Sequence, residues 1–144
     1  MVKGRDYTGI SVTFFCHDGD GNFVLHKRGA RCRDENFTWD FGGGSLEHGE
    51  TLEDGVMREV AEEYGTKPLT MQFLGFDEVF REHNGAQTHW IAFRYKVLVS
   101  RDAVINAEPE THDEIGWFAL DALPAPLHSQ LPHCLEKYKT QLRE

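Results

Sequence analysis

Hydrophobic residues in the first third of the chain occur in short runs separated by glycine, aspartate and asparagine. Residues Ile10–Cys16 read ISVTFFC, a β-branched and aromatic run that predicts a buried strand. The segment His17–Asn22 (HDGDGN) has the composition of a tight turn. Phe23–Arg28 (FVLHKR) predicts a second strand, which completes a hairpin. Phe37–Phe41 (FTWDF) predicts a short third strand that runs into a glycine-rich loop.

Over Thr51–Tyr64 the apolar residues recur every three or four positions, which predicts the main helix. Thr51 is a suitable N-cap, and Glu53 and Asp54 stand in the first turn, where the helix dipole favours anions. Gly65 follows the last helical position and is a good C-terminal stop. We therefore expect a helix with defined ends at this place in the chain.

Two stripes of side chains run along this predicted helix. The apolar stripe comprises Val56, Met57, Val60, Ala61 and Tyr64. Glu59, Glu62 and Glu63 fall at positions i, i+3 and i+4 on a second stripe, roughly 140° from the first. We expect the apolar stripe to pack on a sheet and the three carboxylates to point elsewhere.

The remaining pattern predicts further strands and a second helix. Strands are expected near Thr70–Arg81 and His89–Ser100, joined by a loop at Asn84–Gly85, followed by a short strand at Ile115–Phe118. A final helix is expected over about His128–Leu142. This order predicts an α/β fold, with a mixed β-sheet between helices as an α/β/α sandwich, and one domain over residues 1–144.

Composition and charge narrow the classes of protein. No stretch approaches the ~18 apolar residues that span a bilayer, and the first ten residues lack a secretory pattern, so no membrane partner is expected. The net charge of −9 argues against duplex nucleic acid as a partner. A phosphate-bearing ligand would then need a bound divalent cation to attract it. The cysteines Cys16, Cys32 and Cys134 are odd in number and widely spaced, which predicts free thiols and a cytoplasmic protein.

The segment from Gly44 to Thr66 reads G-x5-E-x7-R-E-U-x-E-E-x-G-x. It resembles the Nudix box of the Nudix (MutT-like) hydrolases. The matching positions are Gly44, Glu50, Arg58, Glu59, Val60, Glu62, Glu63 and Gly65. The chain departs from the family pattern at Thr66, where an aliphatic residue is usual, and at Gly42, where proline is common and where we expect a looser loop. A third departure, Gly55 within the helix, costs about 1 kcal/mol.

The resemblance implies a metal-dependent hydrolase that acts on nucleoside diphosphates linked to another moiety. It implies Mg²⁺ as cofactor, with Mn²⁺ able to substitute, held by carboxylates that suit a hard cation. The implied metal ligands are Glu59, Glu62, Glu63, the backbone carbonyl of Gly44, and Glu50 either directly or through water. Arg58 would orient the glutamates through salt bridges.

The resemblance leaves the general base open. A glutamate of the box is our first hypothesis, Glu59 ahead of Glu62. Carboxylates outside the box are the alternative; they are Glu82, Glu110 and Glu114.

Substrate-binding residues are expected outside the box. Lys27 and Arg28, with Arg31 and Arg33 close behind, form a basic cluster that predicts a phosphate clamp, the alternative being a solvated hairpin end. Five aromatic side chains are candidates for base stacking, with core packing as the alternative for each. They are Phe14, Trp39, Phe80, Trp90 and Trp117, and we take Trp39 as a substrate-binding residue. His128, with its neighbours Leu127 and Ser129, is a candidate for the base pocket. The eight histidines contain no HExxH motif.

We expect the substrate to be a small nucleotide, most simply a (deoxy)nucleoside triphosphate cleaved to monophosphate and pyrophosphate. ADP-ribose or another sugar nucleotide, and a dinucleoside polyphosphate, are the alternatives among enzymes. A non-catalytic nucleotide-binding module is the alternative from another class, and its expected mark, a lost box glutamate, is absent here. A homodimer is left open, because no sequence feature marks an interface.

Overall fold

The computed structural model describes all 144 residues, from Met1 to Glu144. Seven strands, three α-helices and two 3₁₀ turns follow one another along the chain. They are β1 (Gly9–His17), β2 (Asn22–Arg28), β3 (Trp39–Asp40), β4 (Gly42–Ser45), α1 (Leu52–Tyr64), β5 (Thr70–His83), β6 (Ala86–Leu98), η1 (Arg101–Ala103), β7 (His112–Ala119), η2 (Leu120–Ala122), α2 (Leu131–Lys137) and α3 (Lys139–Arg143). No helix is both long enough and apolar enough to cross a membrane.

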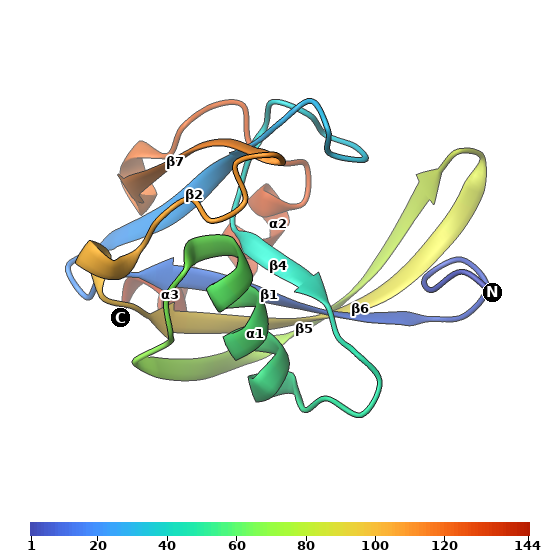
Figure 1. Cartoon of the computed structure of the whole chain (residues 1–144), viewed down its shortest axis with the longest axis horizontal. Helices are drawn as coiled ribbons and strands as arrows, with labels where there is room; N and C mark the ends of the chain where they lie inside the picture. Colours follow the sequence, from blue (N-terminus) through green and yellow to red (C-terminus); the bar gives the residue numbers. More distant parts are fainter.

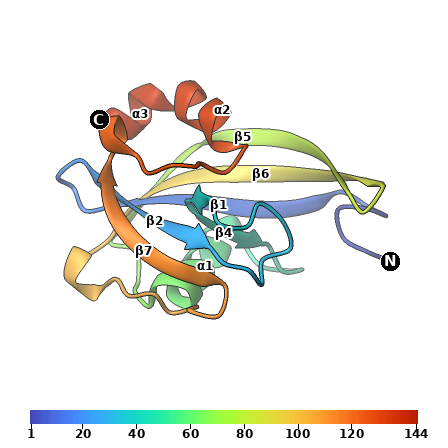
Figure 2. The ribbon, with the colours of Figure 1, turned by 90° about the horizontal axis from the view of Figure 1, so that it is seen from above.

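The strands form one mixed sheet that lies between helices. Helix α1 covers one face, and α2 and α3 cover the other (Figures 1 and 2). The sheet has seven strands with the path β3-β2-β1-β6-β5, to which β4 adds on β1 and β7 adds on β2. Only β1 and β6 pair in parallel, and all other pairs are antiparallel. The predicted α/β/α sandwich with a mixed sheet is confirmed.

Strand β1 lies in the middle of the sheet, and side chains on both of its faces are buried. Phe14 packs on the α1 side together with Val56 and Tyr64, whereas Phe15 packs on the opposite side with Leu131. A strand that is covered on both faces needs apolar residues at successive positions, not only at alternate ones. This explains why Phe14, Phe15 and Cys16 follow one another with no polar residue between them.

One edge of β1 has two different neighbours along its length. Residues Ser11–Phe14 pair with β4, whereas β2 pairs with β1 only where His17 faces Phe23. The predicted β1–β2 hairpin therefore exists, but its two strands separate soon after the turn. Residues of β2 and β4 line the cavity that holds the candidate site.

Helix α1 has the predicted ends. Thr51 Oγ1 accepts a hydrogen bond from the Asp54 N–H at 3.1 Å, and Gly65, at φ 66°, donates its N–H to the Ala61 carbonyl. The predicted division into two stripes is partly wrong. Met57 and Ala61 are exposed, whereas Glu63 is buried on the face that meets the sheet.

Two other predicted elements differ from the structure. Of Phe37–Phe41 only Trp39–Asp40 is a strand, because Phe37 adopts a left-handed conformation at φ 66°. The expected glycine loop is strand β4, hydrogen bonded to β1. At Gly42 a Cβ would overlap the Phe14 ring, so the strand approaches this ring closely only because the residue has no side chain.

The predicted final helix is shorter and divided. It begins at Leu131, and Tyr138, at φ −108° and ψ 13°, interrupts it between α2 and α3. The Tyr138 hydroxyl donates to Asp77 of β5 at 2.9 Å, so the break lies where the helix is fastened to the sheet. β7 also extends beyond the predicted Ile115–Phe118 strand at both ends.

Candidate active site

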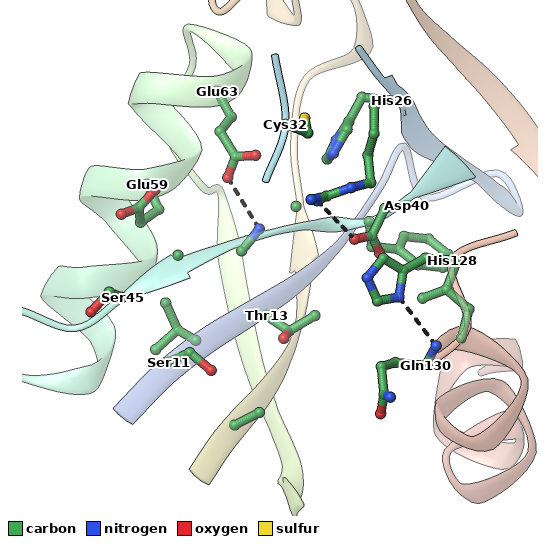
Figure 3. A pocket seen from close by; sticks show the side chains of 18 of the residues that line it. Ser11, Thr13, His26, Cys32, Asp40, Ser45, Glu59, Glu63, His128 and Gln130 are labelled. Carbon is green, nitrogen blue, oxygen red and sulfur yellow. Dashed lines mark hydrogen bonds and ion pairs between the residues drawn. The ribbon is translucent and has the colours of Figure 1, made fainter. Parts of the chain in front are cut away.

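A cavity of about 510 Å³ opens beside the first half of β1, in the size range of small-molecule sites. Glu59 and Glu63 of α1 reach it from one side (Figure 3). His26, Asp40 and His128 lie on the other side (Figure 3). The two walls therefore differ in chemistry, because one carries the acidic box and the other carries mixed basic and acidic groups.

Arg58 organises the box glutamates. Its Nε and Nη2 donate to the two oxygens of Glu50 at 2.8 and 2.9 Å, and its Nη1 donates to Glu59 at 2.8 Å. Glu62 is a longer contact, at 3.4 Å, and Nη2 also donates to the Ser45 carbonyl at 3.1 Å. The two-pronged guanidinium contact fixes the loop before α1 against the helix. Arg58 thus contacts three of the glutamates that the family resemblance implies it orients.

Gly44 lies directly under the Glu59 carboxylate. A Cβ at Gly44 would overlap all three heavy atoms of that carboxylate group. The strand can therefore approach the acid only because this residue has no side chain. This contact brings the backbone of β4 and the Glu59 carboxylate into one small space.

Glu63 is the most enclosed acid of the box, with 5% of its surface exposed. Its Oε2 accepts a hydrogen bond from the Gly43 N–H at 3.1 Å, and its Oε1 lies 3.5 Å from His112 Nε2. Glu62, by contrast, has a side chain that is 49% exposed and does not line the cavity. The three helical carboxylates therefore point in different directions in this structure.

Burial raises the pKa values of the box glutamates, whereas hydrogen bonds from Arg58 lower them. Hydrogen bonds from Arg58 lower the pKa of Glu50 to about 2. Burial raises the pKa of Glu59, with a further increase from the neighbouring Glu62, although Arg58 opposes it. Burial raises the pKa of Glu63 well above its usual value, and the Glu59 charge adds to the effect. A cation placed among these groups would lower the raised pKa values of Glu59 and Glu63.

On the opposite wall, Arg28 borders the cavity and is held in place by Asp34. Its Nε and Nη2 donate to the Asp34 carbonyl at 3.1 and 3.0 Å, and Nη1 lies 3.8 Å from the Asp40 carboxylate. Burial raises the pKa of Asp40 to about 7, against the opposing effect of Arg28. Asp40 is thus a carboxyl group that titrates near neutrality inside the cavity.

His128 also borders the cavity, and Glu35 connects its loop to two other segments. His128 Nε2 lies 3.1 Å from Glu35, which accepts hydrogen bonds from the N–H and hydroxyl of Ser129. Arg81 of β5 donates to the same carboxylate at 2.7 Å. The position predicted for a base pocket is therefore an ordered, charged corner of the cavity.

Two predicted substrate-binding residues do not line the cavity. Lys27 follows His26 on β2 and so faces the other side of the strand. Trp39 is buried in the core, where the centroids of its ring and of the Phe118 ring are 5.2 Å apart. Among the predicted stacking aromatics only Trp90 lines the cavity.

The glutamate outside the box that reaches the cavity is Glu108, which sequence reasoning missed. Glu82, Glu110 and Glu114 do not line it. Burial raises the pKa of Glu108, and Glu62 raises it further. Glu108 lies in the segment before β7, outside any motif, so no sequence feature could have singled it out.

Arg94 of β6 forms part of the cavity floor and was also missed. Its Nε donates to Asp77 at 3.1 Å and its Nη1 donates to Thr13 at 2.8 Å. Arg94 stands in an apolar, aromatic strand, where the alternating pattern of β6 offered the only sign that one face would be polar.

The family model described as NUDIX domain matches residues 8–138 of this chain. The chain therefore belongs to the NUDIX domain family. The family resemblance of the sequence corresponds to three parts of the structure, which are the mixed sheet, strand β4 with its glycines, and helix α1 with its glutamates.

Individual known proteins are also similar to this chain. The NAD-capped RNA hydrolase NudC of Pseudomonas aeruginosa is 32% identical over 87 residues, which are 60% of this chain and 28% of that protein. The chain thus spans little more than a quarter of the length of that relative. The RNA pyrophosphohydrolase of Rhodospirillum rubrum is 32% identical over 127 residues, with 74% of each protein covered. The crystal structure of a MutT NUDIX hydrolase from Burkholderia pseudomallei has a TM-score of 0.79 and 30% identity, with 91% of this chain and 98% of that chain covered.

Proposed function

We propose that this protein is a Mg²⁺-dependent Nudix hydrolase that cleaves the pyrophosphate linkage of a nucleoside diphosphate derivative. The observation that supports this most directly is the Arg58 network, which holds Glu50 and Glu59 against the glycine strand at one wall of the cavity. Three relatives or neighbours named above carry hydrolase or pyrophosphohydrolase names.

The residues present fit a hard divalent cation. The oxygen donors that line the acidic wall are those of Gly44, Glu59 and Glu63, and Mg²⁺ and Mn²⁺ prefer oxygen ligands. Glu50 and Glu62 lie beside this wall, in contact with Arg58. The close approach of Gly44 to the Glu59 carboxylate supports a shared role for these two groups. When bound, the cation would polarise a phosphoryl oxygen and lower the pKa of water.

The chain's own groups would orient the reactants and move one proton. We propose that Glu59 accepts a proton from the attacking water at its carboxylate, because burial strengthens its basicity and Arg58 fixes its position. Glu62 is the alternative within the box. Arg28 and His128, on the opposite wall, would bind the phosphate and the nucleoside part of the substrate.

The substrate we propose is a (deoxy)nucleoside triphosphate, cleaved to monophosphate and pyrophosphate. A cavity of about 510 Å³ supports a ligand of mononucleotide size. A sugar nucleotide such as ADP-ribose, or a dinucleoside polyphosphate, is the second candidate, since Nudix relatives differ in the partner of the diphosphate. We also propose a reducing compartment, the cytoplasm, on the basis of the three free cysteines. A homodimer stays a prediction.

The test is product analysis on a panel of nucleotides in heavy-oxygen water, with and without Mg²⁺. We expect metal-dependent release of a monophosphate and one labelled product that identifies the phosphorus attacked. Glu62→Gln should lower turnover by on the order of 100-fold or more with the thermal unfolding temperature unchanged, because Glu62 is half exposed. Glu53→Gln is the matched control on the same helix and should leave turnover unchanged. Binding without turnover across the panel would favour a nucleotide-binding module instead.

A further inference from the structure

Arg94 of β6 is a buried cation of the cavity that the proposed reaction does not use. The residue is 6% exposed, and its Nε and Nη1 donate to Asp77 and Thr13. A guanidinium has five N–H donors in one plane, and the two N–H groups of Nη2 have no partner in the protein. His112 Nδ1 is the one fully buried side-chain atom without a partner, so Nη2 stays accessible from the cavity. Nη2 is therefore a fixed donor that is left for a ligand.

The partners of Arg94 fix its position and balance its charge. Asp77 lies 3.1 Å from Arg94 Nε, and the two side chains are each 8% exposed. Asp77 also accepts hydrogen bonds from Lys137 and Tyr138, so the carboxylate cannot turn away. A guanidinium whose charge is already paired presents its free N–H groups as directed donors. Such a donor suits a neutral acceptor, for example a carbonyl oxygen.

Arg94 lies on the face of the sheet opposite to the helix that carries the box glutamates. Lys96, two residues further along β6, donates to the Gln141 carbonyl of α3, and side chains two positions apart in a strand share a face. Glu59 belongs to α1, which covers the other face (Figures 1 and 2). In Figure 3, Glu59 lies on one side of β4, and Thr13, the partner of Arg94, lies on the other. A ligand that fills the cavity therefore brings different parts of itself to Glu59 and to Arg94.

The strand positions beside Arg94 suit a flat ring. Trp90 and Ala92 precede it at intervals of two residues, so they share its face, and both line the cavity. Ala92 and its pairing partner Ser11 in β1 are small. The Trp90 ring packs on Gly9, where a Cβ would overlap it, so the indole is held in place. A fixed indole, small side chains and a directed donor are together what a nucleobase needs for stacking and for a hydrogen bond.

We propose that Arg94 selects the nucleobase of the substrate, and that it favours a purine with a carbonyl group at C6 over adenine. This inference rests on the proposed function and names the substrate class of the same cavity. Nη2 donates to the carbonyl oxygen, in the way that arginine recognises guanine on nucleic acids. Adenine has an amino group at that position, and two donors that face each other both lose a partner. Thr13 and Asp77 are positioning residues, because each acts through Arg94.

The test measures binding by isothermal titration calorimetry and does not depend on turnover. The probes are the non-hydrolysable α,β-methylene analogues of inosine triphosphate and ATP, which have a carbonyl and an amino group at C6, with Mg²⁺ present. We expect the wild-type protein to bind the inosine analogue about 10-fold more tightly or better. Arg94→Lys keeps a cation beside Asp77 but removes the Nη2 donor, and should reduce this preference to about twofold or less. Arg143→Lys, at an exposed arginine that pairs with Asp121, is the matched control and should keep the preference.

Thr13 gives a second pair of variants, which leave the buried Arg94–Asp77 pair intact if Arg94→Lys fails to fold. Thr13→Val removes the hydroxyl that accepts from Nη1, so it should reduce the preference by about threefold or more. Thr13→Ser keeps the hydroxyl and should retain the preference. A residue with a merely structural role would change the thermal unfolding temperature and leave the ratio of the two affinities unchanged.

The proposal is overturned if the wild-type protein binds the two analogues equally or binds neither. It is also overturned if a folded Arg94→Lys protein binds both more weakly by the same factor, which would indicate a phosphate contact, or if Thr13→Ser loses the preference as fully as Thr13→Val. If the wild-type protein prefers the inosine analogue but hydrolyses neither inosine triphosphate nor ATP, the inference about Arg94 holds and the proposed function fails.

Discussion

Gly44 shows how a single missing side chain shapes the site. In Gly44→Ala the new Cβ would overlap the Glu59 carboxylate, which Arg58 holds at 2.8 Å, so the acid must leave its position. We expect turnover to fall by on the order of 100-fold. The thermal unfolding temperature should change little, because β4 keeps its pairing with β1. Turnover close to that of the wild type in a folded Gly44→Ala protein would show that the Glu59 position is not required.

Asp40 gives a prediction about pH at the same scale. Its pKa is raised from 3.8 to about 7 in the folded protein, so the folded state binds its proton more tightly than the unfolded chain does. Its contribution to stability is complete below about pH 4 and is lost as the pH rises to about 7. Asp40→Asn cannot titrate, so its free energy of unfolding should fall less over this interval. Urea unfolding of both proteins from about pH 4 to about pH 8 measures the difference, and parallel curves would contradict it.

The candidate site was predictable from the sequence where its contacts are local. Glu50, Arg58 and Glu59 lie within one loop and one helix turn, so spacing alone brings them together. His26 and His112 lie together only because β2 pairs with β7. The register of that pairing shifts between Lys27 and Arg28, and no sequence motif predicts the shift. The burial of Glu63 likewise depends on how far α1 is rotated on the sheet, which helical spacing does not fix.

At the scale of elements, Asp77 joins α2 and α3 to the sheet. This carboxylate of β5 accepts hydrogen bonds from Arg94, Lys137 and Tyr138 and lies 3.3 Å from His133. These contacts hold its pKa well below the usual value, although burial opposes them. A lowered pKa stabilises the folded state above pH 3.8, and that contribution is lost as the pH falls below it.

Asp77→Asn should therefore lower the free energy of unfolding by about 3 kcal/mol at neutral pH. It should also flatten the loss of stability in acid. Denaturant unfolding measures both effects. Glu136→Gln is the control, since Glu136 pairs with Lys139 at the surface of the same helical segment and should cost less than about 0.5 kcal/mol. Equal effects of the two substitutions would contradict the role assigned to Asp77.

The elements themselves show which parts of the fold a sequence specifies locally. α1 was predicted with the correct ends because Thr51 and Gly65 act on the adjacent backbone. The C-terminal helix was predicted as one element because its break at Tyr138 coincides with a bond to a strand about sixty residues earlier in the chain. The glycine strand β4 was missed because glycine has a low strand propensity and pairs here through its backbone with β1.

At the scale of the whole molecule, stability should be unevenly distributed. β1 pairs with β6 over its full length, Gly9–His17, and is covered by helices on both faces. The turn at Asn84–Gly85 ends the β5–β6 hairpin away from all three α-helices (Figure 1). We expect the slowest amide hydrogen exchange in β1 and the fastest within the sheet near that turn. Exchange measured residue by residue by NMR tests this. Equal protection at both places would indicate that the sheet opens only as a single cooperative unit.

The two successive neighbours of β1 also bear on how ligand preference can change in a chain of this kind. Each strand that lines the cavity is held by backbone pairing with its neighbours in the sheet, so its position is hard to alter by substitution. The connecting segments around Asp34 and His128 lie outside the named strands, yet both reach the same opening. Selectivity can therefore diverge through these two loops while the helix that carries the carboxylates stays unaltered.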